Sequence, residues 1–300
     1  MVGAKGGSPV PASATPSVTS LPPAISAARA WVPRVRDRRI VRSACCALVL
    51  PTYNEAVNLP LLLPRLFAQQ ERLARHTLHV VVVDDESPDG TATVVREWMQ
   101  REPRLHLLSG PKRGLGEAYQ RGFAYALGEL HAELVVQMDA DLQHDPGLIP
   151  LFVTACQSGF EVVIGSRFVP GGALVAFSWR RRLSSRVGNW LLRVVSRLPP
   201  LHDYTSGYRC LRAESLAACD LRGLATRGYA FQSSLLGALL RRRARVLEVP
   251  IVFAPRQHGS SKLGRDDYLE FLRNLGRLRR YNTTREPGAQ RTTCAHPPRS

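Results

Sequence analysis

The chain has 300 residues, enough for one large α/β domain or two smaller ones with a substantial core. Its 41 basic and 24 acidic residues give a net charge of +17, which suits nucleic acid, an anionic membrane surface or a phosphorylated substrate as partner. No uncharged stretch is both long enough and free enough of proline to span a bilayer, and no apolar segment follows Met1. We therefore expect neither a transmembrane helix nor a conventional signal peptide.

The two ends of the chain differ in composition from the middle. Residues 1–43 are rich in Pro, Ser and Ala and end in a basic run, which predicts a disordered basic N-terminal tail; a transit peptide or a membrane-touching arm are the alternatives. Residues 281–300 are predicted to form a disordered C-terminal tail. One folded domain is predicted over residues 44–280. The six cysteines form no CxxC pair, which favours core thiols in a reducing compartment.

From Cys45 onward, strand-like and helix-like segments alternate. Short apolar runs predict strands at 46–50, 78–84, 104–109, 133–139 and 161–165. Helices are predicted at 54–75, 91–101, 116–128 and 147–158, with amphipathic patterns at 180–200 and 266–280. Helices between successive strands favour an α/β fold with a mostly parallel sheet covered on both faces. Ligands of such sheets bind at the carboxyl ends of the strands.

The strand at 78–84 runs into two aspartates and a Pro-Asp-Gly turn, VVVVDDESPDGT. An aspartate at a strand end is suited to accept hydrogen bonds from a base or a ribose, as in dinucleotide-binding folds. A role at the start of the following helix is an equally good interpretation for Asp84 or Asp89.

The segment VVQMDADLQHDP (135–146) carries the most informative pattern. Side chains alternate along a strand, so Asp139, Asp141 and Gln143 are expected to point the same way. Two close carboxylates need a neutralising partner, and hard oxygen donors favour Mg²⁺ or Mn²⁺ carrying a diphosphate. The glycines of residues 112–122 lack the spacing of a dinucleotide fingerprint, and no P-loop motif occurs.

The second half of the chain is rich in arginine. Arg167 follows the strand at 161–165, and Arg256 and Lys262 lie in a loop after an apolar run. Several cations at one sheet edge favour an anion-binding site. The helix predicted at 180–200 has an apolar stripe beside an arginine stripe, which suits either packing on the domain or an anionic membrane interface. No nucleic-acid-binding module is recognisable, so nucleic acid is not an expected partner.

Nine motifs occur in order: PTYNE (51–55), DDESPDGT (84–91), GLGEAYQRGF (114–123), DADLQHDP (139–146), GSRFVPGG (165–172), SRVGN (185–189), TSGYRCL (205–211), GYAFQ (228–232) and EVPIVF with GSSKL (248–263). Together they resemble the polyprenyl-phosphate mannosyltransferases, the dolichol-phosphate mannose synthase group of glycosyltransferase family 2, over roughly residues 45–275. This resemblance implies a GT-A nucleotide-sugar fold for the domain.

The resemblance also implies inverting transfer of mannose from GDP-mannose to a polyprenyl (dolichyl or undecaprenyl) phosphate, with Mg²⁺ or Mn²⁺. It implies a metal held by Asp139, Asp141 and Gln143. It places around the nucleotide sugar Pro51, Tyr53, Glu55, Asp84, Asp139, Asp141, Gln143, Arg256 and Lys262. It places around the acceptor phosphate Arg167, Arg181 and Ser185. The residues expected to carry catalysis are Asp141, Arg167, Arg181 and Arg256.

The chain departs from the family pattern at two places. Where relatives often carry Glu after GYxFQ it has Ser233 and Ser234, and Ser260 replaces the acid of the usual GESK. Two alternatives therefore stay open: the same fold using UDP-glucose or another nucleotide sugar, and an inactive membrane-associated scaffold. The expected location is the cytoplasmic face of a membrane, with peripheral attachment; oligomeric state and a membrane-protein partner stay open.

Overall fold

The computed structural model describes residues 43–224, 228, 230–256 and 265–283, apart from the side chains of residues 180–181, 265–269 and 280–283. Both segments predicted as disordered tails lie outside the described residues, except for Ser43 and residues 281–283. In the described part of the chain, no helix combines the length and the apolar character that crossing a membrane requires.

A seven-stranded sheet forms the centre of the described structure. Its strands are β1 (Ala44–Thr52), β2 (His76–Asp84), β3 (Leu105–Ser109), β4 (Leu134–Gln137), β5 (Val162–Ser166), β7 (Arg209–Arg212) and β8 (Val246–Pro250). They lie in the order β3-β2-β1-β4-β7-β5-β8, and every pairing is parallel except those of β7. Two short strands, β6 (Ala173–Leu174) and β9 (Val252–Phe253), pair separately. The predicted mostly parallel sheet is thus confirmed.

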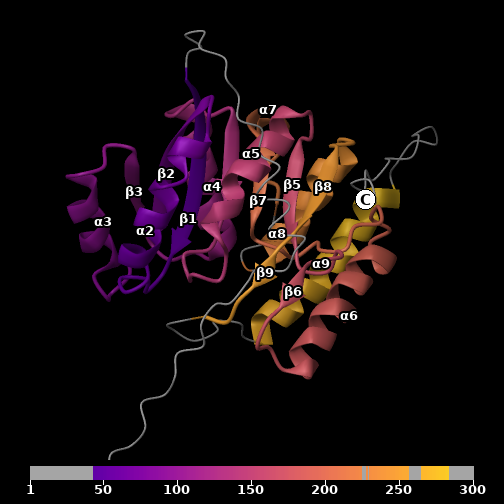
Figure 1. Ribbon diagram of the computed structural model, residues 1–300. Coiled ribbons are helices and arrows are strands. Elements are labelled where there is room, and N and C mark those ends of the chain that lie inside the picture. The colour runs from indigo at the N-terminus through magenta and orange to yellow at the C-terminus, as the bar shows by residue number, and fades with distance from the viewer. Residues whose placement is uncertain (1–42, 225–227, 229, 257–264, 284–300) are drawn as a thin grey trace, which may run out of the picture.

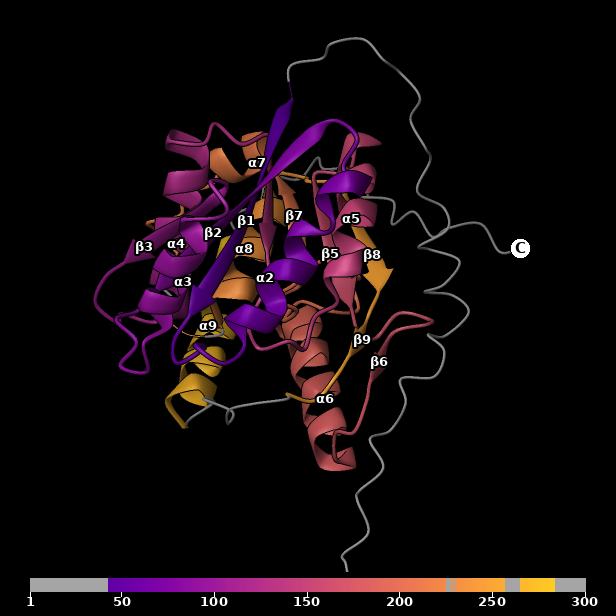
Figure 2. The same ribbon diagram turned by 60° about the vertical axis from the view of Figure 1, so that its left-hand side comes forward.

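Helices cover both faces of the sheet (Figures 1 and 2). One face carries α2 (Leu59–Phe67), α3 (Thr91–Met99) and α5 (Ile149–Gln157), and the other carries α4 (Leu115–Gly128) and α8 (Ala230–Arg241). The helix α9 (Arg265–Thr283) packs on α8, and α6 (Trp179–Val195) packs on α9. Both views show α6 and α9 side by side, extending past the ends of the parallel strands. A short helix, α7 (Ala213–Ala217), follows β7.

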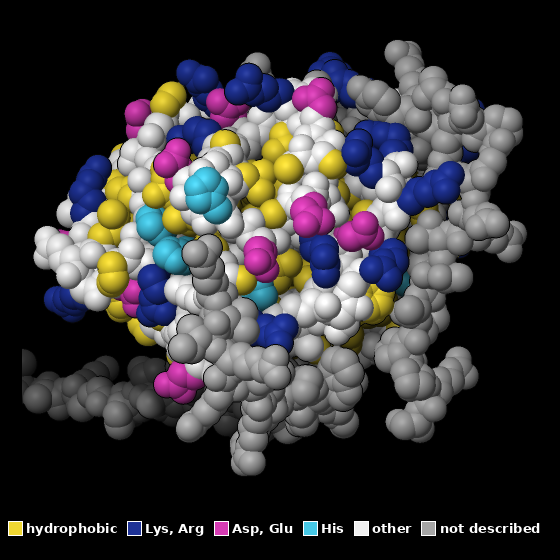
Figure 3. All heavy atoms as spheres, turned by 90° about the horizontal axis from the view of Figure 1, so that it is seen from above, with side chains coloured by type: hydrophobic (Ala, Val, Ile, Leu, Met, Phe, Trp, Pro, Cys, Tyr) yellow, Lys and Arg dark blue, Asp and Glu magenta, His cyan; other side chains and the backbone are white. Residues whose placement is uncertain are grey.

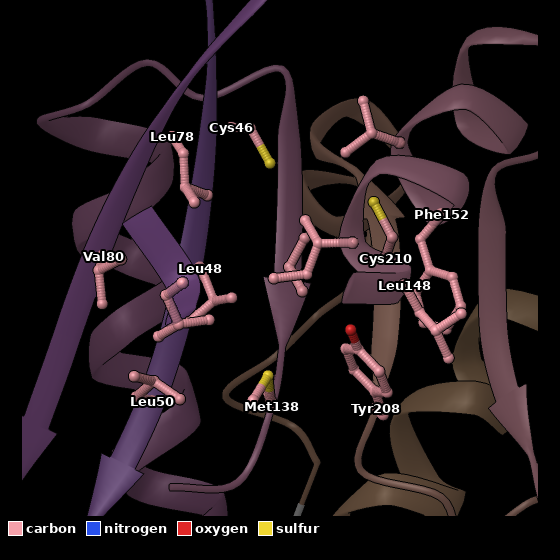
Figure 4. Packing of buried hydrophobic residues seen from close by; sticks show 14 of the residues in the cluster. Cys46, Leu48, Leu50, Leu78, Val80, Met138, Leu148, Phe152, Tyr208 and Cys210 are labelled. Atoms are coloured by element: carbon pink, nitrogen blue, oxygen red, sulfur yellow. The ribbon is translucent and has the colours of Figure 1, made fainter. Parts of the chain in front are cut away.

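The alternation of side chains along β1 divides the core in two. Cys46, Leu48 and Leu50 belong to the cluster under α2, α3 and α5, part of which Figure 4 shows. Ala47 and Val49 belong to the cluster under α4 and α8. Because both faces are buried, the strand reads as a continuous apolar run. Each fully buried valine or leucine stabilises the fold by roughly 1.5–3 kcal/mol.

The helix predicted at 54–75 is the main error in the first half. The observed α2 covers only Leu59–Phe67, and a single 3₁₀ turn follows at Gln70–Arg72. The residues before α2 are held as a loop by the neighbouring turn: Asn54 N donates to Ser87, and Ala56 N donates to Asp89. These bonds connect positions more than 30 residues apart, which local periodicity does not encode.

The antiparallel strand β7 and the helix α8 were not predicted. β7 has four residues, two of them arginine, so it lacks the apolar run of a buried strand. Its Arg209 is nevertheless fully buried and donates to the carbonyl oxygens of Tyr204 and Gln232. Backbone oxygens that accept from both terminal nitrogens of this arginine explain why a charged segment lies in the middle of the sheet.

The two ends of the sheet differ in what surrounds them. Figure 3 looks onto the end at which the parallel strands begin, where acidic and basic side chains are interspersed. At the other end lie α6, α9 and the loops that follow the parallel strands. The polar residues that the sequence places after the strands therefore gather at this carboxyl edge.

We predict that Gly122→Ala destabilises the protein. A Cβ at Gly122 would lie 2.3 Å from Val49 Cγ1 and 3.1 Å from Val83 Cγ2, so α4 would have to move away from the sheet. Overpacking of this kind costs about 1–3 kcal/mol in the free energy of unfolding. Gly128→Ala, in the same helix, is the matched control, because a Cβ there meets nothing within 4 Å. Urea unfolding of both variants measures the difference; equal stabilities would contradict the close packing of α4.

Candidate active site

Five aspartates gather at the carboxyl edge of the sheet: Asp84, Asp85, Asp139, Asp141 and Asp203. All but Asp139 are buried. The first two end β2 or follow it directly, the next two follow β4, and the last precedes β7. Close carboxylates repel one another unless cations or hydrogen-bond donors neutralise them. The arrangement of the site follows from how each is neutralised.

Asp84 ties together the loops that follow β1 and β2. Its Oδ1 accepts from Ser87 Oγ at 2.6 Å and from Thr52 Oγ1 at 3.2 Å, and its Oδ2 accepts from Ser87 N at 3.0 Å. Asp89 likewise accepts from the backbone and hydroxyl of Thr91, the first residue of α3. These two bonds agree with the interpretation that Asp89 acts at the start of the helix α3. Asp85 forms an ion pair with Arg121 of α4.

The residues of PTYNE lie beside this loop. Pro51 is in β1, near its carboxyl end, and Tyr53 follows the strand with Lys112 Nζ 3.4 Å from its ring centroid. Glu55 Oε2 accepts from Asn58 Nδ2 at 2.6 Å. The predicted nucleotide residues of β1 and β2 are thus brought to one place by the parallel pairing of Thr52 with Asp84.

The aspartate loop, residues 138–145, is not an extension of β4 as the sequence predicts. β4 ends at Gln137, and Leu142 has φ of 63°, in the left-handed region that leucine rarely adopts. This turn lets Gln143 N donate to Asp141 Oδ1 at 3.2 Å. The loop, and not the alternation of a strand, therefore places these residues, and a strained backbone at this position is typical of a functional site.

Asp139 is partly exposed and has three neighbours that the sequence did not assign to it. Tyr119 Oη donates to its Oδ1 at 3.4 Å, and His144 Nε2 lies 3.6 Å from its Oδ2. A Cβ on Gly207 would lie 3.3 Å from the same Oδ2, so only glycine leaves the carboxylate room. Burial raises the pKa of Asp139, but His144, Arg256 and Tyr119 outweigh it, so the pKa lies below its ordinary value.

Asp141 is paired with Arg256. The Arg256 Nε lies 2.9 Å from Asp141 Oδ2 and 3.2 Å from Gln143 Oε1. Gln143 Nε2 in turn donates to the carbonyl oxygen of Ala254 at 2.6 Å. Burial and the charge of Asp139 raise the pKa of Asp141 in spite of this arginine. Two of the three predicted metal ligands, Asp141 and Gln143, are therefore in direct contact with the predicted diphosphate-binding arginine.

The oxygen atoms of the aspartate loop suit a divalent cation. Two carboxylates and one amide oxygen are hard donors of the kind that Mg²⁺ and Mn²⁺ prefer. A guanidinium group already lies against two of these oxygens, which shows that they accept a cation. Among the described residues, no group of three or more His, Cys, Asp or Glu is arranged to hold a metal ion.

Arg167 is held by Asp203. Its Nε and Nη2 donate to the two carboxylate oxygens at 2.7 Å each, and Nη2 also donates to Thr205 Oγ1 at 2.7 Å. Burial raises the pKa of Asp203, but Arg167 outweighs it, so the pKa is lowered. The backbone N–H groups of His202 and Asp203 donate to Glu248 at 2.9 Å, so β8 supports the pair.

A cavity of about 370 Å³ adjoins Arg167 and is lined on another side by Arg182 and Arg186 of α6. Sequence reasoning placed Arg181 and Ser185 at this helix. Ser185 is partly buried, and its carbonyl oxygen accepts from Asn189. The side chain of Arg181 and the residues Ser260 and Lys262 lie outside what the structure describes.

Several residues of the site were missed from the sequence. Asp203, Tyr119 and Arg121 reach it through tertiary contacts that no local pattern signals. His144 follows the aspartates in the motif DADLQHDP, and its ring packs on Tyr208 with centroids 4.9 Å apart. The two serines that replace the family's acid lie in α8, where Asn274 of α9 bonds to both hydroxyls at 2.9 Å.

Residues 47–219 match the family described as Glycosyl transferase family 2, and the chain belongs to this family. The chain is therefore a glycosyltransferase with the GT-A fold. It is 38% identical over 227 residues to "Polyprenol monophosphomannose synthase" of Mycolicibacterium smegmatis, covering 75% of this chain and 83% of the relative. It is 40% identical over 216 residues to "Undecaprenyl-phosphate mannosyltransferase" of Micrococcus luteus, covering 72% and 86%.

A solved structure has a similar fold. It is a mannosyltransferase from Pyrobaculum calidifontis in complex with GDP-Man and Mn²⁺, which matches with a TM-score of 0.53 and 19% sequence identity. The match covers 88% of this chain and 72% of that chain. At 19% identity, this comparison supports the assignment of the fold alone.

We predict that Asp203→Asn destabilises the protein in a pH-dependent way. At pH 7 the variant leaves the buried Arg167 without its counter-ion, which costs about 3 kcal/mol in the free energy of unfolding. A carboxyl whose folded pKa is lowered stabilises the fold above its unfolded pKa of about 4 and loses this effect as pH falls through the folded value. The gap between wild type and variant should therefore narrow from pH 7 to pH 3 in urea unfolding.

The exposed Glu71→Gln is the control, with little effect at either pH. A gap for Asp203→Asn that stays constant over the whole pH range would contradict the lowered pKa.

Proposed function

We propose that the protein transfers mannose from GDP-mannose to a polyprenyl phosphate and that the transfer inverts the anomeric centre. The observation that carries the proposal is the pairing of a carboxylate and amide metal site with a separate arginine-lined cavity at one sheet edge. The names of the relatives, which act on polyprenol or undecaprenyl phosphate, support the acceptor. The runner-up donor is UDP-glucose or another nucleotide sugar.

On the donor side, Pro51, Tyr53, Glu55 and Asp84 would line the nucleoside, and Arg256 with Lys262 would bind the diphosphate. Asp139, Asp141 and Gln143 would hold Mg²⁺ or Mn²⁺. A divalent ion there supplies charge that stabilises the departing nucleoside diphosphate. Pro51 and Asp84 lie in the paired strands β1 and β2, so the sheet fixes the spacing of these two residues.

On the acceptor side, Arg167, Arg181 and Ser185 would hold the lipid phosphate, and the cavity position of Arg182 and Arg186 adds two further cations. A phosphate monoester has its second pKa at about 6, so it is already mostly dianionic at neutral pH and needs no general base. Its oxygen attacks the anomeric carbon as the bond to the diphosphate breaks, and the electron pair leaves with GDP. One displacement converts an α-linked donor into a β-linked mannosyl phosphate.

The test incubates the protein with undecaprenyl phosphate, Mn²⁺ and radiolabelled GDP-mannose or UDP-glucose, followed by extraction of glycolipid. We expect labelled lipid from GDP-mannose and none in excess chelator. Asp141→Asn should lower turnover by at least about 100-fold, since the metal contributes several kcal/mol to transition-state stabilisation. Asp220→Asn, an exposed aspartate on another loop, is the matched control.

An α-linked product by NMR, or a covalent sugar–enzyme intermediate, would overturn the single displacement. Labelled lipid formed from UDP-glucose but not from GDP-mannose would show that the donor is UDP-glucose. No labelled lipid from either sugar would favour the inactive scaffold.

We further propose that α6 attaches the protein peripherally to the cytoplasmic face of a membrane. Five of its apolar side chains are exposed at helical spacing: Trp179, Leu183, Val187, Trp190 and Val194. The tryptophans are 69% and 59% exposed, which is unusual for such large apolar side chains. Arginines flank this stripe, and the arginine-lined cavity lies at its side. A lipid phosphate would thus reach the cavity from the surface on which the helix lies.

Vesicle cosedimentation tests this attachment. Trp179→Ser with Trp190→Ser should reduce binding to anionic vesicles, whereas Met99→Ser, an exposed apolar residue on α3, should not. Arg193→Gln with Arg197→Gln should weaken the free energy of binding by about 1 kcal/mol for each cation near the surface. Binding of this double variant should also depend less on salt concentration. Binding that is equal on neutral and anionic vesicles and unaffected by all four substitutions would contradict the role of α6.

A further inference from the structure

Arg256 occupies atoms that the proposed metal would need. Its Nε is within hydrogen-bond distance of Asp141 Oδ2, at 2.9 Å, and of Gln143 Oε1, at 3.2 Å. A divalent cation binds such oxygens at roughly 2.0–2.2 Å for Mg²⁺, through lone pairs that face the ion. A metal ion that took the lone pairs facing Arg256 would therefore have to displace its guanidinium group.

The contact extends to the backbone next to Arg256. Gln143 Nε2 donates to the carbonyl oxygen of Ala254, and Ala254 N donates to Gln143 O at 3.4 Å. The segment Ala254–Arg256 follows the short strand β9, which pairs only with the two residues of β6 in the described structure. The aspartate loop is therefore bonded to the segment that continues the two-residue strand β9.

The charges near Asp141 explain why a cation is needed there. Asp141 is 4% exposed and lies near the carboxylate of Asp139. Another arginine of the site, Arg167, is already bound in a bidentate pair with Asp203. Leaving two close carboxylates without a cation is costly, so a cation beside Asp141, whether Arg256 or a metal ion, stabilises the site.

We propose that Arg256 is an exchangeable counter-ion: it neutralises Asp141 while the site is empty and moves to the donor diphosphate when the metal ion takes its place. This inference rests on the proposed metal site and goes beyond it by coupling metal entry to donor binding. The diphosphate offers the guanidinium a new anion at the moment at which it leaves the old one. Metal and nucleotide then bind cooperatively, and a metal ion alone binds weakly because it must displace an arginine.

Mn²⁺ titrations of the full-length protein, followed by the EPR signal of free Mn²⁺, test the exchange without any turnover. Arg256→Met removes the competing cation, so Mn²⁺ alone should bind at least about fivefold more tightly than to wild type, and GDP should enhance Mn²⁺ binding less than in wild type. Arg113→Met removes the same charge from an exposed position and is the matched control, with Mn²⁺ affinity within about twofold of wild type.

Two results would overturn the inference in distinguishable ways. If wild type binds Mn²⁺ with GDP but Arg256→Met leaves the affinity for Mn²⁺ alone unchanged or weaker, the exchange is wrong and the metal site stands. If wild type binds no Mn²⁺ even with GDP, the metal site itself is wrong and the inference fails with it. An equal gain in the Arg113→Met control would show a general effect of charge, and would also refute direct competition.

Discussion

The mutual repulsion of aspartates at one edge of the sheet is the constraint on which the rest of the site depends. Two unit charges 4 Å apart interact by about 4 kcal/mol at the effective dielectric constant near a protein surface. The fold gives each carboxylate its own partner: Ser87 and Thr52 for Asp84, Arg121 for Asp85, His144 for Asp139, Arg256 for Asp141 and Arg167 for Asp203. These partners come from different elements, so the site assembles only when the whole sheet does.

The partnerships are of two physical kinds. The pair of Arg167 and Asp203 is bidentate, almost wholly buried and supported from β8 by Glu248, so it is part of the framework. In the pair of Asp141 and Arg256, the Arg256 Nε lies 2.9 Å from Asp141 Oδ2, and the arginine follows a two-residue strand. The first pair suits positioning of an anion, whereas the second lies at the proposed metal ligands, where another cation can take its place.

The parts of the structure that the sequence predicted are those with a strong local signal. Four valines in β2 specify a strand buried on both faces, and the polar residues after it mark the edge at which ligands bind. The errors occur where distant contacts override local pattern. Asn54 and Ala56 leave the predicted helix because Ser87 and Asp89 bind their N–H groups. The charged β7 is a central strand because backbone oxygens accept from both terminal nitrogens of Arg209.

The aspartate loop shows the same limit within the site. The residues Asp139, Asp141 and Gln143 were predicted correctly as neighbours of one another, but for the wrong geometric reason, because the strand ends at Gln137 and Leu142 turns the chain. The chemical pattern of the side chains was therefore more informative than the assumed period of the backbone. Their partners His144, Tyr119 and Arg256 could not be assigned, because each contact depends on how separate elements pack.

The distribution of partners also bears on the class of reaction that the site can perform. Asp139, Asp141 and Asp203 each lie against a cation, a histidine or a hydroxyl donor, so each is committed to an electrostatic role. A sugar hydroxyl acceptor would require one carboxylate to remove its proton, whereas a phosphate acceptor arrives without a proton that must be removed. What a phosphate acceptor requires instead is charge that lets two anions approach, and arginine suits this because its planar fork binds two oxygens at once. Among the described residues, the lining of the cavity at Arg167, Arg182 and Arg186 includes no acidic side chain. Carboxylates paired with cations on one side and a cavity lined by arginines on the other are thus the arrangement expected for transfer between two phosphate groups.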